Sequence, residues 1–418
     1  MSKAGRLSLS AQLALSLRDL RRAPRRSLVT LASVVLSMAS LTFLSALNEG
    51  WLHGMQDQFT LGRVGHVQIR GASLGGTLDP GTSHLPPAVV AGALRGVSSV
   101  AAMTRRVETA GLVATPAGSA GARILGLDPT GETGVTRIGD MLVGGRWLAV
   151  DSPRDLLLAE NLARGIGADL GDRVILTAQR PGGELTAEAF HLVGVLCGAS
   201  PTVDRMLAVV PLATTQSWLG LGEHVTHIVL RLTDASESIR VRSEVARALP
   251  AERYEVVAWQ DLDPVLFQWL TLSRAYSVAI TLVVVGVVVT QAVNTLLMVV
   301  HERTREIGLL QALGLEGSQV FRVILLEGLI LVTAGGALGI LTGAGAAVYA
   351  AREGVDLSRF AEAFEYFYMD PVIRPVLDRH TVVLVAVTTV LTALVAGLYP
   401  AWKAARVKPG PTLRGGAR

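Results

Sequence analysis

Four long runs of apolar residues divide the chain into segments of different character. Crossing about 30 Å of membrane hydrocarbon takes roughly 20 helical residues, and each run is close to that length or longer. The runs lie at approximately Leu28–Leu47, Tyr276–Val300, Val320–Ala350 and Thr381–Leu398. A signal peptide is the alternative for the first run, but signal peptides have only about 7–15 apolar residues, and no clear cleavage site follows here. We therefore expect four transmembrane helices.

Between the first two runs the pattern changes to short alternating segments separated by Gly, Pro and Asp, which is typical of a folded α+β domain. The order strand, helix, strand occurs near its start, at Gly65–Arg70, Pro86–Val97 and Ala122–Pro129. The same order returns near its end, at Thr226–Leu232, Ala235–Leu249 and Tyr254–Trp259. The predicted fold is an α-helical membrane protein with a large extracytoplasmic α+β domain, in which two βαβ-like half-units bracket a β-rich subdomain at about 140–222.

Composition supports a membrane protein. Of the 418 residues, 50% are hydrophobic and only 17% are charged, and the mean hydropathy is +0.45. The single cysteine, Cys197, excludes an internal disulfide or a cysteine-based zinc cluster, and we expect it to be a packed thiol. The net charge of +4 does not indicate nucleic acid, because the basic residues concentrate at the chain ends and beside apolar runs.

Basic residues predict the orientation in the membrane. Seven lie between Lys3 and Arg26, and five lie between Lys403 and Arg418 with no acidic residue among them. Because such residues are enriched on the cytoplasmic side, both termini are expected there. The predicted order begins with an N-terminal amphipathic arm (1–26), a first span (27–48), the external domain (49–271) and a second span (272–300). A cytoplasmic helix (301–315), a third span (318–350), a short external loop (351–379), a fourth span (380–400) and a cytoplasmic tail (401–418) follow.

Motifs for catalysis or nucleotide binding do not emerge. No Gly-Lys pair is present, so the chain lacks a P-loop and any ATPase must be a separate subunit. The glycines of Gly335–Gly339 lie inside an apolar run rather than after a strand. His224 and His227 lack a third ligand, and Gly118–Gly121 lacks the spacing of a nucleophile elbow. We expect a non-catalytic chain without a metal or cofactor of its own.

Two features of the third span are informative. Gly335, Gly339 and Gly343 recur every four residues, which places them on one stripe that another helix backbone could approach closely. General tolerance of glycine in membrane helices is the alternative. Glu327 lies within the same apolar run, where an ionisable side chain is expected to face protein or water, or to extend to the cytoplasmic interface.

The segment "HERTREIGLLQALG", His301–Gly314, follows the second span and is rich in charge. It predicts a two-turn amphipathic helix with an apolar side and a polar side that could enter a groove on a soluble partner. A simple turn between spans is the alternative. The residues assigned to this contact are Glu302, Arg303, Arg305, Glu306, Ile307, Leu310, Leu313 and Gly314.

This segment resembles the signature of the FtsX-like (MacB/FtsX, type VII) permeases of ABC transporters, in which it forms a coupling helix. The tail "YPAWKAARVKPGPTLRGG" and the start "LALSLRDLRRAPRRSLVT" resemble the same family, so the resemblance covers essentially the whole chain. The external segments "GHVQIR", "ILGLDPTGE" and "LLLAENLARGIGADLGDRVIL" are similar to the lipoprotein-releasing LolC/LolE branch.

The resemblance implies a place in the bacterial inner membrane, with the large domain and the short external loop in the periplasm, and a set of partners. They are a cytoplasmic ABC ATPase dimer that binds ATP and Mg²⁺, a second permease subunit forming a homo- or heterodimer, lipoprotein cargo, a periplasmic carrier and membrane lipid, with no nucleic acid. It also implies lipid contact near the external ends of the first two spans, at Phe43, Leu47, Phe267 and Leu270, for which interfacial anchoring is the alternative. The alternative functions are a mechanotransmitting regulator of a cell-envelope enzyme, or an exporter of peptides or drugs.

Overall fold

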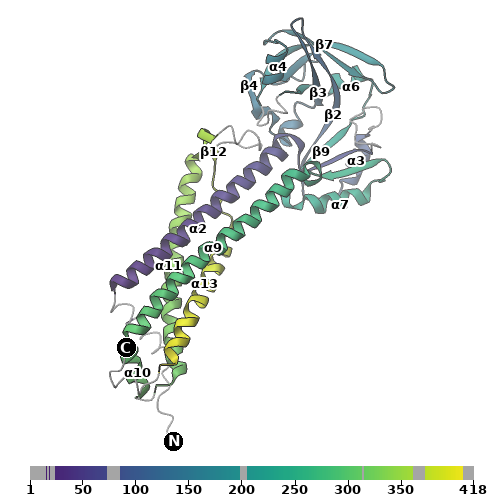
Figure 1. The fold of residues 1–418 in the computed structure, drawn as a ribbon. Coiled ribbons are helices and arrows are strands. Elements are labelled where there is room, and N and C mark those ends of the chain that lie inside the picture. The colour runs from purple at the N-terminus through teal and green to yellow at the C-terminus, as the bar shows by residue number, and fades with distance from the viewer. Residues whose placement is uncertain are drawn as a thin grey trace. The chain divides into compact units, whose positions relative to one another are not determined.

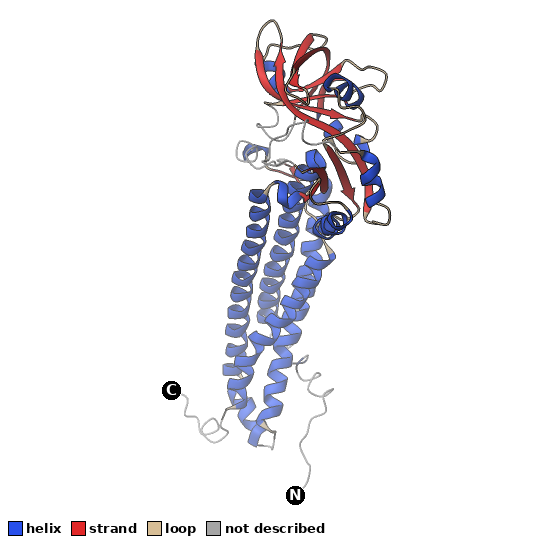
Figure 2. Ribbon diagram, turned by 90° about the vertical axis from the view of Figure 1, so that its right-hand side faces the viewer, coloured by secondary structure: helices blue, strands red, loops and turns tan. Residues whose placement is uncertain are grey.

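The computed structural model describes residues 16, 18, 24–72, 85–197, 205–312, 315–360 and 372–407. The chain forms two compact units. The helical unit comprises Met1–Leu52, Leu270–Asp356 and Val372–Arg418, and the sheet unit comprises His53–Trp269 and Leu357–Pro371. Figure 1 labels many of their elements, and Figure 2 distinguishes helices from strands.

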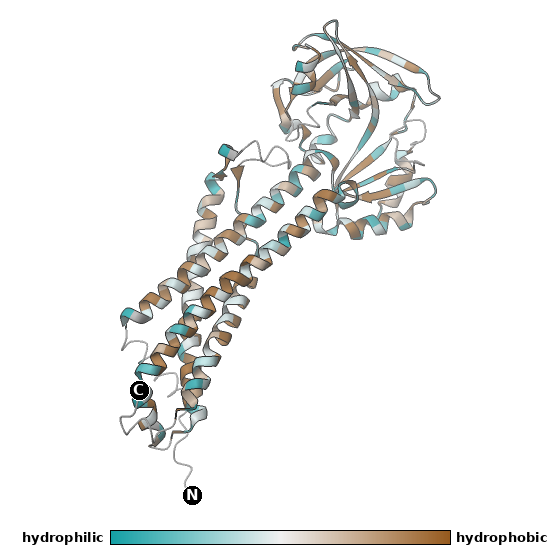
Figure 3. Ribbon diagram, in the orientation of Figure 1, coloured by the Kyte–Doolittle hydropathy of each residue, from teal (hydrophilic) through white to brown (hydrophobic). Residues whose placement is uncertain are grey.

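Four helices of the described chain are long and apolar enough to cross a membrane. They are α2 (Pro24–Phe59), α9 (Pro264–Glu302), α11 (Gly317–Glu353) and α13 (Arg379–Ala405). Figure 3 shows hydrophobic residues along all four. Each begins earlier or ends later than the predicted span, because a helix does not have to stop where its apolar residues stop. α2 in particular continues through Asn48 and Glu49 to Phe59.

The helical unit has a core to which all four long helices contribute. Val34 and Met38 of α2 pack with Val288 of α9, Val332 of α11 and Ala393 of α13, all of them buried. The loop between α11 and α13 contains a short two-stranded sheet, in which β11 (Val355–Asp356) pairs with β12 (Val372–Ile373).

The described residues of the sheet unit form ten strands that belong to one mixed sheet. They are β1 (Val67–Gly71), β2 (Val100–Ala114), β3 (Ser119–Leu127), β4 (Leu142–Gly145), β5 (Asp155–Ala159), β6 (Arg173–Gln179), β7 (Leu185–Leu196), β8 (Leu207–Pro211), β9 (His227–Leu232) and β10 (Tyr254–Ala258). The helices among them are α3 (Pro87–Ala93), α4 (Glu160–Gly165), α6 (Leu212–Leu219), α7 (Ser238–Ala248) and α8 (Trp259–Leu262). Short helical turns are η1 (Thr60–Val64), η2 (Glu132–Gly134), η3 (Ile138–Met141), η4 (Ala235–Glu237) and η5 (Ser358–Phe360).

The first part of the sheet has the order β10-β1-β9-β2. Strand β9 is antiparallel to both β1 and β2, and β1 is antiparallel to both β9 and β10. In the unit β1-α3-β2, the two strands are separated by β9, and in the unit β9-α7-β10 they are separated by β1. The predicted fold class is confirmed, and the two half-units interlock into one layer, as split βαβ units do.

The second part of the sheet is a ring. The pairing runs from β2 through β3, β8, β5 and β7 to β6, and β6 pairs again with β2. The 15-residue strand β2 belongs to both parts, because its first half pairs with β9 and its second half pairs with β3 and β6. The β-rich part thus begins well before residue 140. No turn or change of composition marks the point where one continuous strand changes partners, so the sequence did not reveal it.

Buried apolar residues of both parts form one cluster, from Val67 and Ile69 of β1 to Leu157 of β5 and Phe190 of β7. In the described residues, the two parts of the sheet therefore share a core. Cys197 follows the end of β7 and is exposed, contrary to the expected packed thiol, because it lies just beyond the last core residue of that strand, Leu196.

Candidate functional site

The charged segment after the second span forms the helix α10 (Thr304–Ala312), shorter than the predicted 301–315. Arg303 separates α10 from α9, and the hydroxyl of the next residue, Thr304, donates to the carbonyl of Val300 at 2.8 Å. Leu313 and Gly314 lie outside the described residues, as does the side chain of Leu310.

Ile307 was predicted to face a partner, but it packs inside its own chain. Its side chain is 6% exposed and belongs to an apolar cluster at one end of the bundle. The other members of this cluster are Val300 of α9, Val320 and Ile324 of α11, and Ala401 and Ala404 of α13. The assignment of Ile307 to the partner face is corrected, because the nearest apolar surface available to a short helix between two spans is the bundle itself.

The outward face of α10 carries Arg305, Glu306 and Leu309. Leu309 is 52% exposed and lies four residues after Arg305, so the two side chains occupy neighbouring positions on one face. Glu302, one turn before Glu306, is also exposed, and Arg303 is half-buried. Leu309 was missed, although its i, i+4 spacing from Arg305 was a signal that could have indicated it. We call Arg305, Glu306 and Leu309 the outward face of α10; Glu302 is the last residue of α9.

The glycine stripe of α11 faces α2. A Cβ atom at Gly339 would lie 2.6 Å from Met38 Cβ and 2.8 Å from the Val35 carbonyl oxygen. A Cβ at Gly343 would lie 2.5 Å from the Ala39 carbonyl oxygen, and one at Gly335 would lie 2.9 Å from Val34 Cγ1. These distances are shorter than side-chain contacts allow, so glycine is what lets the two helices approach.

A second set of glycines, which sequence reasoning missed, lies between α11 and α13. A Cβ at Gly397 would be 2.8 Å from Leu325 Cδ1, and one at Gly328 would be 3.6 Å from the Gly397 Cα. Gly336 faces Thr389 closely. The third span therefore meets two neighbouring helices through small residues.

Replacing Gly339 with leucine should separate α2 from α11. The added side chain has no space beside Met38, and overpacking of this kind typically costs about 1–3 kcal/mol. We expect a lower thermal unfolding temperature for the detergent-purified chain. Gly345→Leu is the matched control, since a Cβ there would meet nothing within 4 Å. Equal unfolding temperatures for the two variants would show that this stripe is not a close contact.

Glu327 lies on α11 about 15 Å from the start of the helix, given a rise of 1.5 Å per residue. Its side chain is 3% exposed and so points into the protein rather than toward lipid. One turn earlier, the carbonyl of Val323 accepts a hydrogen bond from the Ser16 hydroxyl at 3.1 Å. This part of α11 thus combines a buried carboxyl group with a contact to the N-terminal arm.

The residues expected near lipid have different surroundings. Phe43 and Leu47 are half-buried on α2, and Leu270 is buried at the start of the helical-unit part of α9. Phe267 is 39% exposed and packs edge-on against Trp259, with 6.0 Å between ring centroids. All four remain predictions as lipid contacts.

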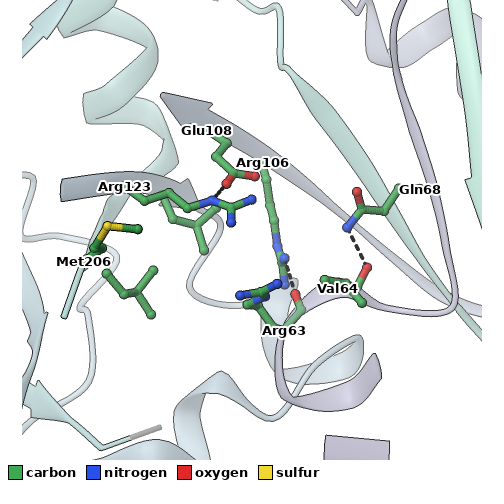
Figure 4. A pocket seen from close by; sticks show the side chains of 9 residues that line it. Arg63, Val64, Gln68, Arg106, Glu108, Arg123 and Met206 are labelled. Atoms are coloured by element: carbon green, nitrogen blue, oxygen red, sulfur yellow. Dashed lines mark hydrogen bonds and ion pairs between the residues drawn. The ribbon is translucent and has the colours of Figure 1, made fainter. Parts of the chain in front are cut away.

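The sheet unit contains a buried ion pair that sequence reasoning did not find. Arg106 of β2 is 4% exposed and Glu132 of η2 is 1% exposed. The Arg106 Nε donates to Glu132 Oε2 at 3.1 Å, and Nη2 contacts Glu132 Oε1 as well. The Arg106 Nη1 also donates to the backbone carbonyl of Arg63 in η1, as Figure 4 shows. One guanidinium thus links β2 to η1, the turn that follows α2.

The described histidines of this unit do not gather into a metal site. His227 of β9 is buried beside Thr226, with 2.8 Å between its Nδ1 and the threonine hydroxyl. Burial, together with the nearby Arg70, Arg106 and Arg123, lowers the pKa of His227 to about 3, so the imidazole is neutral. Across the residues described, no group of three or more His, Cys, Asp and Glu side chains could hold a metal ion.

Two family models match this chain. The MacB-like periplasmic core domain matches residues 27–248, more than half of the chain, and the FtsX-like permease C-terminal domain matches residues 276–409. The chain belongs to the MacB/FtsX family of ABC-transporter permeases. It is therefore a multi-pass membrane protein, and permeases of this kind work with an ATPase partner.

Curated relatives of this permease carry two kinds of name. The lipoprotein-releasing system transmembrane protein LolC of Xylella fastidiosa (strain Temecula1) is 26% identical over 309 residues, covering 70% of this chain and 73% of the relative. The corresponding LolE of Haemophilus influenzae is 23% identical, covering 77% of each. The macrolide export ATP-binding/permease protein MacB of Campylobacter jejuni (serotype O:23/36) is 23% identical, covering 92% of this permease and 58% of the relative.

Proposed function

We propose that this permease is a non-catalytic subunit that converts ATP hydrolysis by a separate ATPase into a conformational change. The observation that carries this proposal is the two-sided character of α10. Its outward face is charged and exposed around Leu309, while Ile307 on its inner side contacts the ends of three long helices. ATP and Mg²⁺ would bind to the ATPase, and this chain would bind neither.

The packing supports a route for the motion. An ATPase that holds the outward face displaces α10 when two ATPase subunits close on nucleotide, and Ile307 carries the displacement to α9, α11 and α13. Helix α9 is continuous from Pro264 to Glu302, so a movement at its Glu302 end is not absorbed by a break in the helix. The nucleotide state would thus bias a two-state equilibrium of the bundle.

The orientation follows from the same proposal. If α10 contacts a cytoplasmic ATPase, both chain termini lie in the cytoplasm and residues 53–269 lie in the periplasm. The excess of basic residues near both termini supports this orientation. A second permease subunit, identical or related, would complete the complex.

Lipoproteins of the inner membrane are the proposed cargo, passed to a periplasmic carrier and then toward the outer membrane. The names of the LolC and LolE relatives support this choice. The names of the MacB relatives favour export of a small molecule as the second candidate. A regulator of an envelope enzyme would need no cargo at all.

Crosslinking tests the cargo. Photoreactive residues at Phe43 and Leu47 should capture a triacylated lipoprotein when the permease, its ATPase and the second subunit turn over ATP in liposomes. Leu36, which is 69% exposed on the same helix, is the control position and should capture phospholipid only. Capture of phospholipid alone at all three positions would exclude lipoprotein contact there, and equal lipoprotein capture at Leu36 would show nonspecific contact.

A further inference from the structure

The C-terminal end of α13 carries an exposed stack of two aromatic side chains and one cation. Tyr399 and Trp402 are 50% and 46% exposed, and their rings stack with 6.2 Å between centroids. The guanidinium carbon of Arg406 lies 4.1 Å from the centroid of the Trp402 ring. A guanidinium this close to an indole is held by a cation–π interaction, so its position is set before any ligand binds. We call Tyr399, Trp402 and Arg406 the α13 stack.

The exposed face of α13 changes its character along the helix. Leu391, Val395 and Leu398 are about half exposed and follow one another at spacings of four and three residues, and Trp402 continues the same row. The packed side of the helix is different, since Ala401 and Ala404 are fully buried in the apolar cluster at this end of the bundle. Apolar residues that face lipid are thus followed by two aromatics and then by a cation, which is the order expected where a membrane helix enters the headgroup layer.

The length of α13 places the guanidinium among lipid headgroups. Arg379 is the first residue of the helix, and Arg406 follows its last residue. The 27 residues of α13 span about 40 Å at 1.5 Å per residue, which is close to the thickness of a bilayer with its headgroup regions. No Asp, Glu, Lys or Arg lies between Arg379 and Lys403. The two ends of α13 therefore fit the two opposite headgroup layers.

The charge at this end of α13 favours an anionic lipid over a zwitterionic one. Lys403 lies three residues before Arg406, and the helix contains no acidic residue. The N–H donors of a guanidinium lie in its own plane, so they can reach phosphate oxygens while the carbon contacts the ring. A second cation one turn away attracts a lipid with a net negative charge, because a zwitterionic headgroup adds its own ammonium group to the site.

We propose that the α13 stack binds the headgroup of an anionic phospholipid. Arg406 donates to the lipid phosphate, and Trp402 positions the guanidinium, with Tyr399 supporting the indole from its other neighbour position on the helix. The bound lipid would hold the end of α13 whose packed side contributes Ala401 and Ala404 to the cluster around Ile307. It would thus stabilise the part of the bundle that contacts α10. This inference does not depend on the cargo or on an ATPase.

Native mass spectrometry of the full chain in detergent, titrated with phosphatidylglycerol or with phosphatidylcholine of the same acyl chains, tests the proposal. The original chain should bind phosphatidylglycerol at least about fivefold more tightly. Arg406→Gln should weaken phosphatidylglycerol binding about fivefold, the usual contribution of one basic residue at an anionic membrane surface. Trp402→Leu should weaken it as well, although the charge is unchanged. The double variant should bind no more weakly than Arg406→Gln alone, because Trp402 acts through the arginine.

Arg322→Gln is the matched control. It removes an exposed positive charge from α11, where the Arg322 Nε donates to the Ser318 carbonyl of the same helix, and it should bind phosphatidylglycerol like the original chain. Equal affinities for the two lipids, equal binding by Arg406→Gln and Arg322→Gln, or unchanged binding by Trp402→Leu would each overturn the proposal. The same spectra report other occupants of this face. If Arg406→Gln or Trp402→Leu releases a second copy of the chain or a co-purified protein, the α13 stack is a protein interface and the lipid assignment fails.

Discussion

Arg305→Glu and Leu309→Asp should each release the ATPase from this permease without disturbing its fold. The first variant reverses a charge on the outward face of α10, and the second places a carboxylate where an exposed leucine would be covered by the partner. Burying a neutral polar group without a hydrogen bond costs about 2–7 kcal/mol, and an unpaired carboxylate costs more. The interface between α10 and the ATPase should therefore open instead. We expect loss of ATPase co-purification and loss of cargo-coupled ATP hydrolysis in the reconstituted complex.

Two further variants make this result specific. Arg322→Glu reverses a charge near the same end of the bundle but on α11, where Arg322 donates to the Ser318 carbonyl, and it should retain the ATPase. Ile307→Ala should lower the stability of the chain by about 2–5 kcal/mol, because it leaves a space in the apolar cluster. If Arg305→Glu and Leu309→Asp keep both the partner and coupled hydrolysis, α10 is only a turn, and coupling must pass through the N-terminal arm or the tail.

Replacing Arg106 with methionine should destabilise the sheet unit by about 3–5 kcal/mol, the usual cost of leaving one partner of a buried ion pair unpaired. Glu132, which is 1% exposed, would remain buried without the guanidinium that pairs with it. Hydrogen exchange of the full chain should show faster exchange in β2 and η2. Arg164→Met, at an exposed pair, should change the free energy of unfolding by less than about 1 kcal/mol.

The double variant Arg106→Met with Glu132→Met distinguishes the ion pair from simple packing. An apolar pair of similar volume is often as stable as a buried ion pair, so the double variant should recover most of the lost stability. It would still lack the donor to the Arg63 carbonyl, so exchange in η1 should stay fast. Additive destabilisation by the two changes would contradict a dominant role for the pair.

The features that sequence predicted best are those with a local pattern. Four apolar runs predicted the four long helices, and turn residues with alternating strands predicted the α+β domain. The helix ends were less accurate, because α2 continues past its apolar run to Phe59. The ring of six strands was not predicted, since the pairing of β6 with β2 depends on contacts between residues far apart in the chain.

In the candidate sites, too, features with a local sequence pattern were predicted and features that depend on distant residues were not. The glycine spacing on α11 and the charge on α10 are periodic, so they could be recognised without a structure. The direction in which Ile307 points could not, because it depends on Val320 and Ala404, which belong to other helices. Arg106 and Glu132 are 26 residues apart, with no motif to connect them. Only the folded chain shows that one side chain of β2 reaches both η1 and η2.

The shared strand β2 also influences the order in which the sheet unit can assemble. The chain enters the ring in the middle of β2 and leaves it shortly before β9. These two points are close in space, because the Thr226 amide donates to the Arg106 carbonyl at 3.0 Å although 120 residues separate them. Pairing over such distances is entropically costly unless the intervening chain is already compact. During synthesis the ring can close once β8 has emerged, whereas β1 lacks both of its neighbours until β9 and β10 follow. The ring is therefore expected to nucleate folding, and the interlocked layer to form last around it.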